Sequence, residues 1–313
     1  MNSAVIKLTK CSSTKCLAMF QLSYHSQPKV ALDEGISSHR VQVGPHRLHY
    51  LRAGHGPHTL LLIPGVLGFG WSNFKHQLLG FDRDLFTTIA FDPPGNGYSR
   101  PPEKSFPPLE VEAETVAQFM EALGVESASV LGYSSGGRTA MVLAALHQRL
   151  VKKLVLASTH AFILPDEYKY SRSLDCIEET WNEKEKNILY GVYGKENLPK
   201  LWRQFNDFNE RILKEQRGNI CLHLLKDIKC PTQLICGQKD PLTKVENSWL
   251  LHALIENSRI HVYPEGKHSN QIKYAEDFNM RVQDFLMADE ELSGTNLRDD
   301  EEHIKLAKAN FFC

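Results

Sequence analysis

Hydrophobic and polar positions follow two different periods along the chain, and from residue 38 onward segments of the two kinds succeed one another. Short apolar runs bounded by turn residues predict strands, at 40–43, 49–52, 59–63, 87–91, 129–131, 153–157, 233–236 and 260–263. Apolar residues that recur about every 3.6 positions predict helices, at 109–123, directly after residue 134, at 247–255 and at 274–287. This alternation favours an α/β fold in which an eight-stranded, mostly parallel sheet carries helices on both faces.

One long segment interrupts the alternation. About seventy residues separate the strand ending at 157 from the strand starting at 233, several times the length of a simple crossover helix. We expect a helical cap over residues 159–225, folded over the strand ends and shaping an apolar substrate pocket that excludes water. The α/β core then comprises residues 38–158 and 226–288. The aromatic residues of the cap, most of which must pack inside it, are Tyr168, Tyr170, Trp181, Tyr190, Tyr193, Trp202, Phe205 and Phe208.

Composition narrows the class of protein. The 313 residues are 42% hydrophobic and 23% charged, as in an ordinary soluble globular protein. A formal net charge of −1 gives no electrostatic reason to expect nucleic acid as a partner. The sequence has no run of about 18 or more apolar residues that could span a membrane. The apolar segment 60–71 contains a proline and glycines, so it predicts a buried strand followed by a loop.

The seven cysteines lack the spacing of a zinc site or a disulfide framework, which favours a reducing compartment and predicts no metal.

The two ends of the chain differ from the core. Residues 1–37 form a predicted extension that has lysines and hydroxyl side chains but no acidic residue before Asp33, as in a mitochondrial presequence. No arginine precedes Arg40 and the apolar stripe is loose, so a disordered cytosolic extension is the alternative. Residues 289–313 predict a charged, solvated tail.

The strongest chemical signal is a serine between two glycines. An apolar strand runs into Gly132, Ser134 and Gly136, and a mostly apolar helical segment follows. A serine at the tip of a sharp strand-to-helix turn is exposed for attack, and the glycines leave room for strand and helix to approach. The pattern therefore indicates a nucleophile elbow.

A serine hydroxyl needs a base and a group that orients the base. In the fold that uses this elbow, an acid and then a histidine follow the serine, each on a loop after a strand. Asp240 follows the strand at 233–236, and His268 follows the next strand, 28 residues later, which leaves room for one helix. Asp92 is a competing acid, but it precedes the serine and is better explained as a turn residue.

Acyl transfer also needs donors for the oxyanion of the tetrahedral intermediate. One donor is expected from the backbone N–H of Ser135, directly after the nucleophile. The second is expected from the glycine-rich loop after the strand at 59–63, where Val66 is the best candidate.

With these residues in view, the chain resembles the α/β-hydrolase superfamily, and more closely the biphenyl hydrolase-like proteins, over residues 38–288. The strings that carry the resemblance are 62–68, 92–99, the elbow, 218–221, 237–241 and 264–268. The resemblance implies a monomeric, cofactor-free serine hydrolase of small esters with Ser134, Asp240 and His268 as its triad, and a mitochondrial location, with the cytoplasm as the alternative.

One position departs from that resemblance. In the amino-acid-ester hydrolases of this family, an aspartate after the nucleophile holds the substrate's ammonium group, whereas this chain has Ser135. Amino-acyl specificity therefore stays open, with Asp166, Glu167 and Asp175 of the cap as candidate replacements. Two alternatives also stay open: a thioester, lactone or carbon–carbon bond hydrolase or acyltransferase using the same triad, and a non-catalytic binding protein.

Overall fold

The computed structural model describes residues 35–288. The predicted presequence and the predicted charged tail at 289–313 lie outside the described residues, apart from the last three positions of the extension. Both stay predictions. Among the described residues, no helix has the length and apolarity needed to cross a membrane.

The core is one sheet of eight strands in the order β1-β2-β4-β3-β5-β6-β7-β8. Strands β1 and β2 pair antiparallel, and β2 pairs antiparallel with β4, whereas all later pairs are parallel. The predicted eight-stranded, mostly parallel sheet is confirmed. The strands are β1 (Ile36–Val43), β2 (His46–Ala53), β3 (His58–Ile63), β4 (Phe86–Phe91), β5 (Ala128–Tyr133), β6 (Val151–Ala157), β7 (Thr232–Gly237) and β8 (Ser258–Tyr263).

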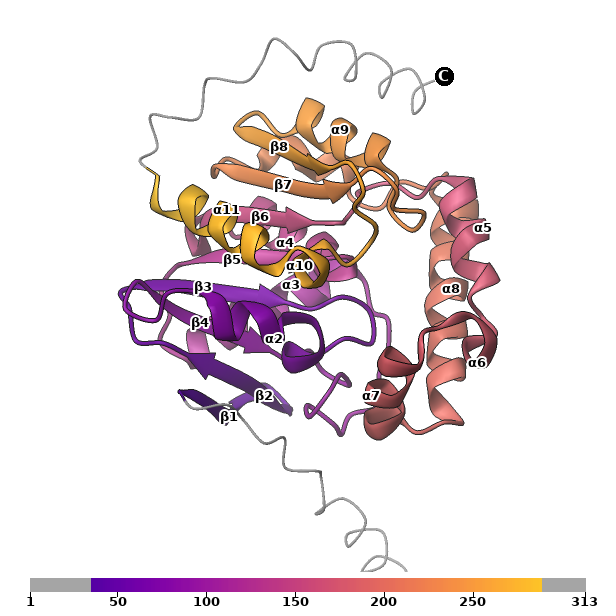
Figure 1. Cartoon of the computed structure of the whole chain (residues 1–313), viewed down its shortest axis with the longest axis horizontal. Helices are drawn as coiled ribbons and strands as arrows, with labels where there is room; N and C mark the ends of the chain where they lie inside the picture. The colour runs from indigo at the N-terminus through magenta and orange to yellow at the C-terminus, as the bar shows by residue number, and fades with distance from the viewer. Residues whose placement is uncertain (1–34, 289–313) are drawn as a thin grey trace, which may run out of the picture. The chain divides into compact units, whose positions relative to one another are not determined.

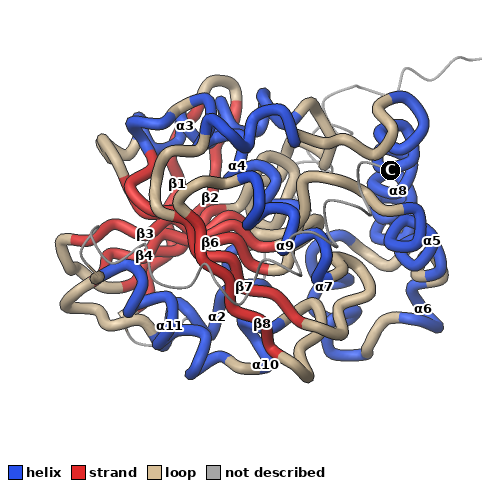
Figure 2. Tube along the Cα trace, turned by 90° about the horizontal axis from the view of Figure 1, so that it is seen from above, coloured by secondary structure: helices blue, strands red, loops and turns tan. Residues whose placement is uncertain are grey.

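Helices cover both faces of this sheet, because its central strands are apolar on both sides. Figure 2 shows α3, α4 and α9 on one face and α2, α10 and α11 on the other. These helices are α2 (Gly70–Gly80), α3 (Leu109–Ala122), α4 (Ser135–Leu146), α9 (Val245–Leu254), α10 (Asn270–Lys273) and α11 (Ala275–Met287), with short 3₁₀ turns at Gln148–Leu150 and Leu222–Asp227.

The helix α2 is a correction to the sequence analysis, which predicted only a loop after the strand at 59–63. Glycines begin and end this helix, and they hid its signal. The glycine at the start is required by close packing, since a Cβ on Gly70 would lie 2.8 Å from the Ala90 carbonyl oxygen. Phe74 and Leu78, four residues apart, are buried on its inner face.

Four helices lie between β6 and β7, beyond the carboxyl ends of the parallel strands (Figure 1). They are α5 (Pro165–Ser173), α6 (Ile177–Thr180), α7 (Glu183–Tyr193) and α8 (Asn197–Glu215). A second apolar cluster joins them to the loop after β3, because Tyr193, Trp202 and Phe205 pack with Leu67 and Phe69. Most of the aromatic residues that drew attention in the sequence thus fill the cap itself or its base.

Candidate active site

Ser134 lies at the turn between β5 and α4 with a strained backbone, φ 54° and ψ −124°. Two hydrogen bonds hold this conformation. The Ser134 N–H donates to the Ala157 carbonyl over 2.9 Å, and the Thr159 hydroxyl donates to the Ser134 carbonyl over 2.7 Å. The side chain therefore stands at the carboxyl edge of the sheet, below the cap.

The two glycines beside the serine sit where no side chain fits. A Cβ on Gly132 would lie 2.7 Å from the Cβ of Ala140, and a Cβ on Gly136 would lie 2.3 Å from the Pro64 carbonyl oxygen. Strand, helix and the loop after β3 therefore approach as closely as the sequence pattern requires.

The structure brings Ser134, His268 and Asp240 into one hydrogen-bonded chain. His268, after β8, has its Nε2 3.0 Å from Ser134 Oγ. Its Nδ1 lies 2.8 Å from Oδ2 of Asp240, after β7. A carboxylate at Nδ1 keeps a proton on that nitrogen, which leaves Nε2 free to accept the serine proton.

Asp240 is buried and its carboxylate is held on all sides. Oδ1 accepts hydrogen bonds from the Leu242 and Thr243 N–H groups at 2.9 and 3.1 Å, and Oδ2 accepts one from the Thr243 hydroxyl at 2.6 Å. The sequence analysis did not identify Thr243. Its position two residues after an Asp-Pro turn is the only signal that sequence offers.

The pKa values of His268 and Asp240 shift in opposite directions, because each group stabilises the charge of the other. Burial favours the neutral imidazole, but the Asp240 carboxylate outweighs it and raises the pKa of His268 above its ordinary value, with smaller contributions from Glu185 and Glu167. Burial likewise favours the neutral acid, yet His268 and the hydrogen bonds from residues 242 and 243 hold the pKa of Asp240 below its ordinary value. The carboxylate thus stays ionised beside the imidazole.

The residue before the nucleophile also positions the base. The Tyr133 ring packs against the His268 ring with 5.3 Å between centroids, and its hydroxyl lies 3.0 Å from Ser269 Oγ. Tyr133 was part of the elbow string, but nothing in the sequence indicated that it would meet a histidine 135 residues later.

The loop after β3 lies directly against the serine. The Gly68 N–H donates to the Gly65 carbonyl over 3.0 Å, which closes a turn with Val66 at its second position. In such a turn the N–H of the second residue is not used by the turn itself. Ser135 is the first residue of α4, so its N–H has no intrahelical partner. A Cβ on Gly65 would lie 3.1 Å from Ser134 Cβ, so this turn lies close enough to bound an oxyanion site.

Asp92, the competing acid, has a structural position. It is fully buried and accepts hydrogen bonds from His49 Nδ1, the Gly70 N–H and the Tyr98 N–H at 2.8 to 2.9 Å. It ties a strand, a helix and a turn together and lies outside the Ser134–His268 chain.

The three cap carboxylates suggested for ammonium binding also have protein partners. Glu167 is buried and accepts from the Leu164 and Lys244 N–H groups and the Asn247 amide. Asp166 pairs with Lys244, and Asp175 pairs with Arg172 and accepts from Asn206. Each of these carboxylates is thus engaged by protein groups, and their role toward a substrate ammonium stays a prediction. Among residues 35–288, no group of three or more potential metal ligands gathers.

Comparison with known proteins adds to this geometry. Residues 58–175 match the family described as the alpha/beta hydrolase fold. The chain is 35% identical to the serine hydrolase BPHL of Mus musculus over 263 residues, covering 83% of this chain and 90% of that protein. It is 26% identical to a 2-hydroxy-6-oxononadienedioate/2-hydroxy-6-oxononatrienedioate hydrolase of Pseudomonas putida, covering 77% and 91%.

A solved structure shows the same fold. The meta-cleavage product hydrolase of Pseudomonas fluorescens IP01 superimposes with a TM-score of 0.67 at 18% identity, covering 81% of this chain and 98% of that one. The two relatives and the protein in this solved structure are all named as hydrolases, the class that the sequence resemblance implied. The chain therefore belongs to the α/β-hydrolase family, together with the serine hydrolase BPHL.

Proposed function

We propose that this protein is a serine hydrolase that cleaves small carboxylic esters through an acyl-enzyme intermediate. The observation that carries the proposal is the hydrogen-bonded chain from Ser134 Oγ through His268 to Asp240. Membership of a hydrolase family supports the reaction class.

In the first half of the reaction, Ser134 Oγ attacks the ester carbonyl carbon while His268 Nε2 takes the hydroxyl proton. The carbonyl oxygen becomes an oxyanion, for which the N–H groups of Val66 and Ser135 are the proposed donors. When the intermediate collapses, the bond to the alkoxy group breaks, and His268 returns the proton to the leaving alcohol.

In the second half, His268 takes a proton from a water molecule as that water attacks the acyl carbon. The bond between Ser134 Oγ and the acyl carbon then breaks, Oγ regains the proton, and the carboxylic acid leaves. Asp240 keeps its negative charge throughout and stabilises the imidazolium.

The test is Ser134→Ala in the full chain. We expect turnover of a phenyl ester to fall by about 10⁶-fold, and labelling by a fluorophosphonate probe to vanish, with the thermal unfolding temperature close to that of the wild type. Ser173→Ala, at an exposed serine of α5, is the matched control and should keep both activities. Retained turnover in Ser134→Ala, or a wild type that neither hydrolyses esters nor takes up the probe, would contradict the proposal; the latter result would favour a non-catalytic binding protein.

Carbon–carbon bond hydrolysis is the second candidate, because the Pseudomonas putida relative is named as a hydrolase of 2-hydroxy-6-oxononadienedioate. The same serine and histidine can serve a ketone substrate in which a carbanion leaves in place of an alkoxide. Product analysis separates the two reactions: an ester yields an acid and an alcohol, whereas a dienedioate yields two carbon fragments.

A further inference from the structure

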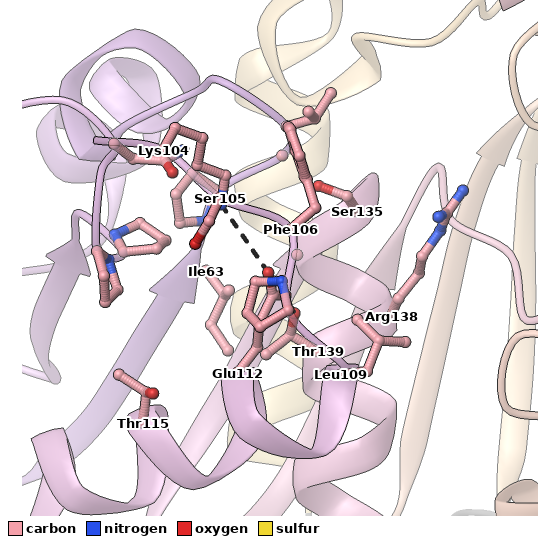
Figure 3. A pocket seen from close by; sticks show the side chains of 18 of the residues that line it. Ile63, Lys104, Ser105, Phe106, Leu109, Glu112, Thr115, Ser135, Arg138 and Thr139 are labelled. Carbon is pink, nitrogen blue, oxygen red and sulfur yellow. Dashed lines mark hydrogen bonds and ion pairs between the residues drawn. The ribbon is translucent and has the colours of Figure 1, made fainter. Parts of the chain in front are cut away.

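A cavity opens beside the proposed oxyanion site, and the mechanism above leaves it unused. Val66 and Ser135 line it, together with residues of the loop before α3, of α3, of α4 and of α8, whereas Ser134 and His268 do not. Figure 3 shows Ser135 and Arg138 of α4 toward one side of the cavity and Lys104 and Ser105 toward the other. Phe106 and Thr139 also line it. The cavity therefore adjoins the proposed oxyanion site.

Arg138 forms one wall and is buried, with 5% of its surface exposed. It lies three positions after Ser135, on the same face of α4. Its Nη1 donates to the Asn209 side-chain oxygen over 2.9 Å, and its Nη2 contacts His160 Nε2. Burial and the charge of Arg138 lower the pKa of His160, so both acceptors are neutral.

The hydrogen-bonding capacity of this guanidinium is incompletely used. Among the described residues, Arg138 Nε has no hydrogen-bond partner. The Glu167 carboxylate lies on the far side of the His160 ring from Arg138, with Oε2 3.4 Å from His160 Nδ1. Burial lowers the pKa of Arg138 to about 10, and the nearby Glu167 and Glu112 carboxylates offset this only in part. A buried cation with an unused donor is costly, and an anionic ligand that accepts from Nε would reduce that cost.

Lys104 brings a second cation to the same cavity. Its side chain is 7% exposed, and its Nζ lies 3.9 Å from Glu112 Oε1, beyond hydrogen-bond length. The other oxygen of Glu112 accepts from the Thr139 hydroxyl at 2.7 Å. The Glu112 carboxylate is thus hydrogen-bonded to Thr139 of α4 and only partly neutralises the charge of Lys104.

The charged groups lining the cavity are therefore Arg138 and Lys104 against Glu112 alone. A carboxylate entering from the ester site would meet the free Nε–H of Arg138 and the ammonium of Lys104, and charge-assisted hydrogen bonds of this kind are strong. A substrate ammonium group would meet repulsion instead. Ser135, between the cavity and the carbonyl site, contributes no charge.

We propose that this cavity is an anion-binding acyl subsite, in which Arg138 and Lys104 select esters whose acyl part ends in a carboxylate, such as monoesters of short dicarboxylic acids. The inference rests on the proposed esterase function and narrows its substrate class.

The test compares three phenyl esters with five-carbon acyl groups on the full chain: pentanoate, hydrogen glutarate and 2-aminopentanoate. We expect kcat/KM for the glutarate monoester to exceed that for pentanoate by roughly 10-fold or more, as one to two charge-assisted hydrogen bonds supply. The aminopentanoate ester should be the poorest. Glutarate should also inhibit pentanoate ester hydrolysis at lower concentration than pentanoate itself does.

Variants assign the preference to the two cations. Arg138→Gln and Lys104→Gln should each lower the glutarate-to-pentanoate ratio of kcat/KM, and Lys104→Gln serves even where the buried Arg138→Gln does not fold. Lys152→Gln removes the same charge at an exposed position of β6 and should leave the ratio unchanged.

The outcomes separate this inference from the function on which it rests. A wild type that cleaves pentanoate or aminopentanoate esters at least as well as the glutarate ester overturns the subsite and leaves the esterase standing. A ratio that survives both Arg138→Gln and Lys104→Gln overturns it as well. No turnover of any ester and no probe labelling at Ser134 overturns both proposals.

Discussion

At the scale of single residues, Asp240 shows how one carboxylate is given a single orientation. Its two oxygens receive four hydrogen bonds, three from residues 242 and 243 and one shared with His268. The local bonds hold the carboxylate without the histidine. The orientation of the imidazole is therefore imposed by the loop after β7.

Asp240→Asn should separate orientation from charge. An asparagine amide accepts hydrogen bonds at its oxygen but donates them at its nitrogen, which favours the wrong tautomer of His268, so kcat should fall by about 10⁴-fold.

The pH dependence of activity is a separate prediction. The wild type should lose activity as the pH falls through a His268 pKa above 6.5, because the base must be neutral. Without the carboxylate, burial prevails and the acid limb should move to lower pH. Measured pH–rate profiles check this, and an unmoved acid limb would contradict it.

At the scale of elements, one tyrosine fastens the cap to the active-site loop. Tyr193, the last residue of α7, is buried, and its hydroxyl donates to the Leu67 carbonyl over 2.9 Å and accepts from the Gly97 N–H over 3.2 Å. Leu67 has a φ of 55° and follows Val66 in the turn beside Ser134. The position of the cap is thus coupled to a strained part of the proposed oxyanion site.

Tyr193→Phe should weaken this coupling. It leaves a buried carbonyl and a buried N–H without their partner, which costs about 1 to 3 kcal/mol of unfolding free energy. Since the same turn carries Val66, kcat/KM should fall by roughly 10-fold. Tyr190→Phe is the control, because within residues 35–288 the Tyr190 hydroxyl donates to the exposed Glu178 carboxylate alone. Denaturant unfolding and ester kinetics measure both effects, and equal behaviour of the two variants would refute the coupling.

At the scale of the whole molecule, the two buried aspartates after strand ends have separate tasks. Asp240 lies in the loop after β7, at the carboxyl edge of the sheet, and is hydrogen-bonded to His268. Asp92 directly follows β4 and is hydrogen-bonded to His49 of β2, Gly70 of α2 and Tyr98 of the following turn. We therefore expect stability to depend mainly on Asp92 and activity mainly on Asp240, although both are buried aspartates that follow strands.

Asp92→Ala should therefore lower the free energy of unfolding by roughly 3 kcal/mol or more, because each buried donor left unsatisfied costs about 1 to 3 kcal/mol. The folded fraction should keep fluorophosphonate labelling at Ser134. Glu121→Ala, at an exposed carboxylate of α3, should change stability by less than about 0.5 kcal/mol. Loss of labelling at a temperature where Asp92→Ala is folded would give Asp92 a role in the site that the structure does not indicate.

The sequence by itself determined the sheet, the elbow and the order of the three proposed catalytic residues. Short apolar runs predict which strands are buried. Gly132 and Gly136 indicate where strand, helix and loop approach too closely for a side chain. Such local requirements are written in neighbouring positions. Residues 1–34 lie outside the described part, so mitochondrial import stays a prediction.

Only the tertiary structure decided which distant side chains meet. Helix α2 escaped prediction because its terminal glycines are explained by distant contacts: Gly70 packs against Ala90, twenty residues away, and Gly80 lies against Asn279. The partners of Tyr193, Thr243, Arg138 and Lys104 carry no local signal, because neighbouring residues do not show which distant group a buried polar side chain will contact. For Arg138 and Lys104 burial itself was unexpected, since arginine and lysine are mostly exposed. Their burial, and the excess of positive charge beside Ser135, arise from contacts between segments far apart in the chain, which no periodicity records.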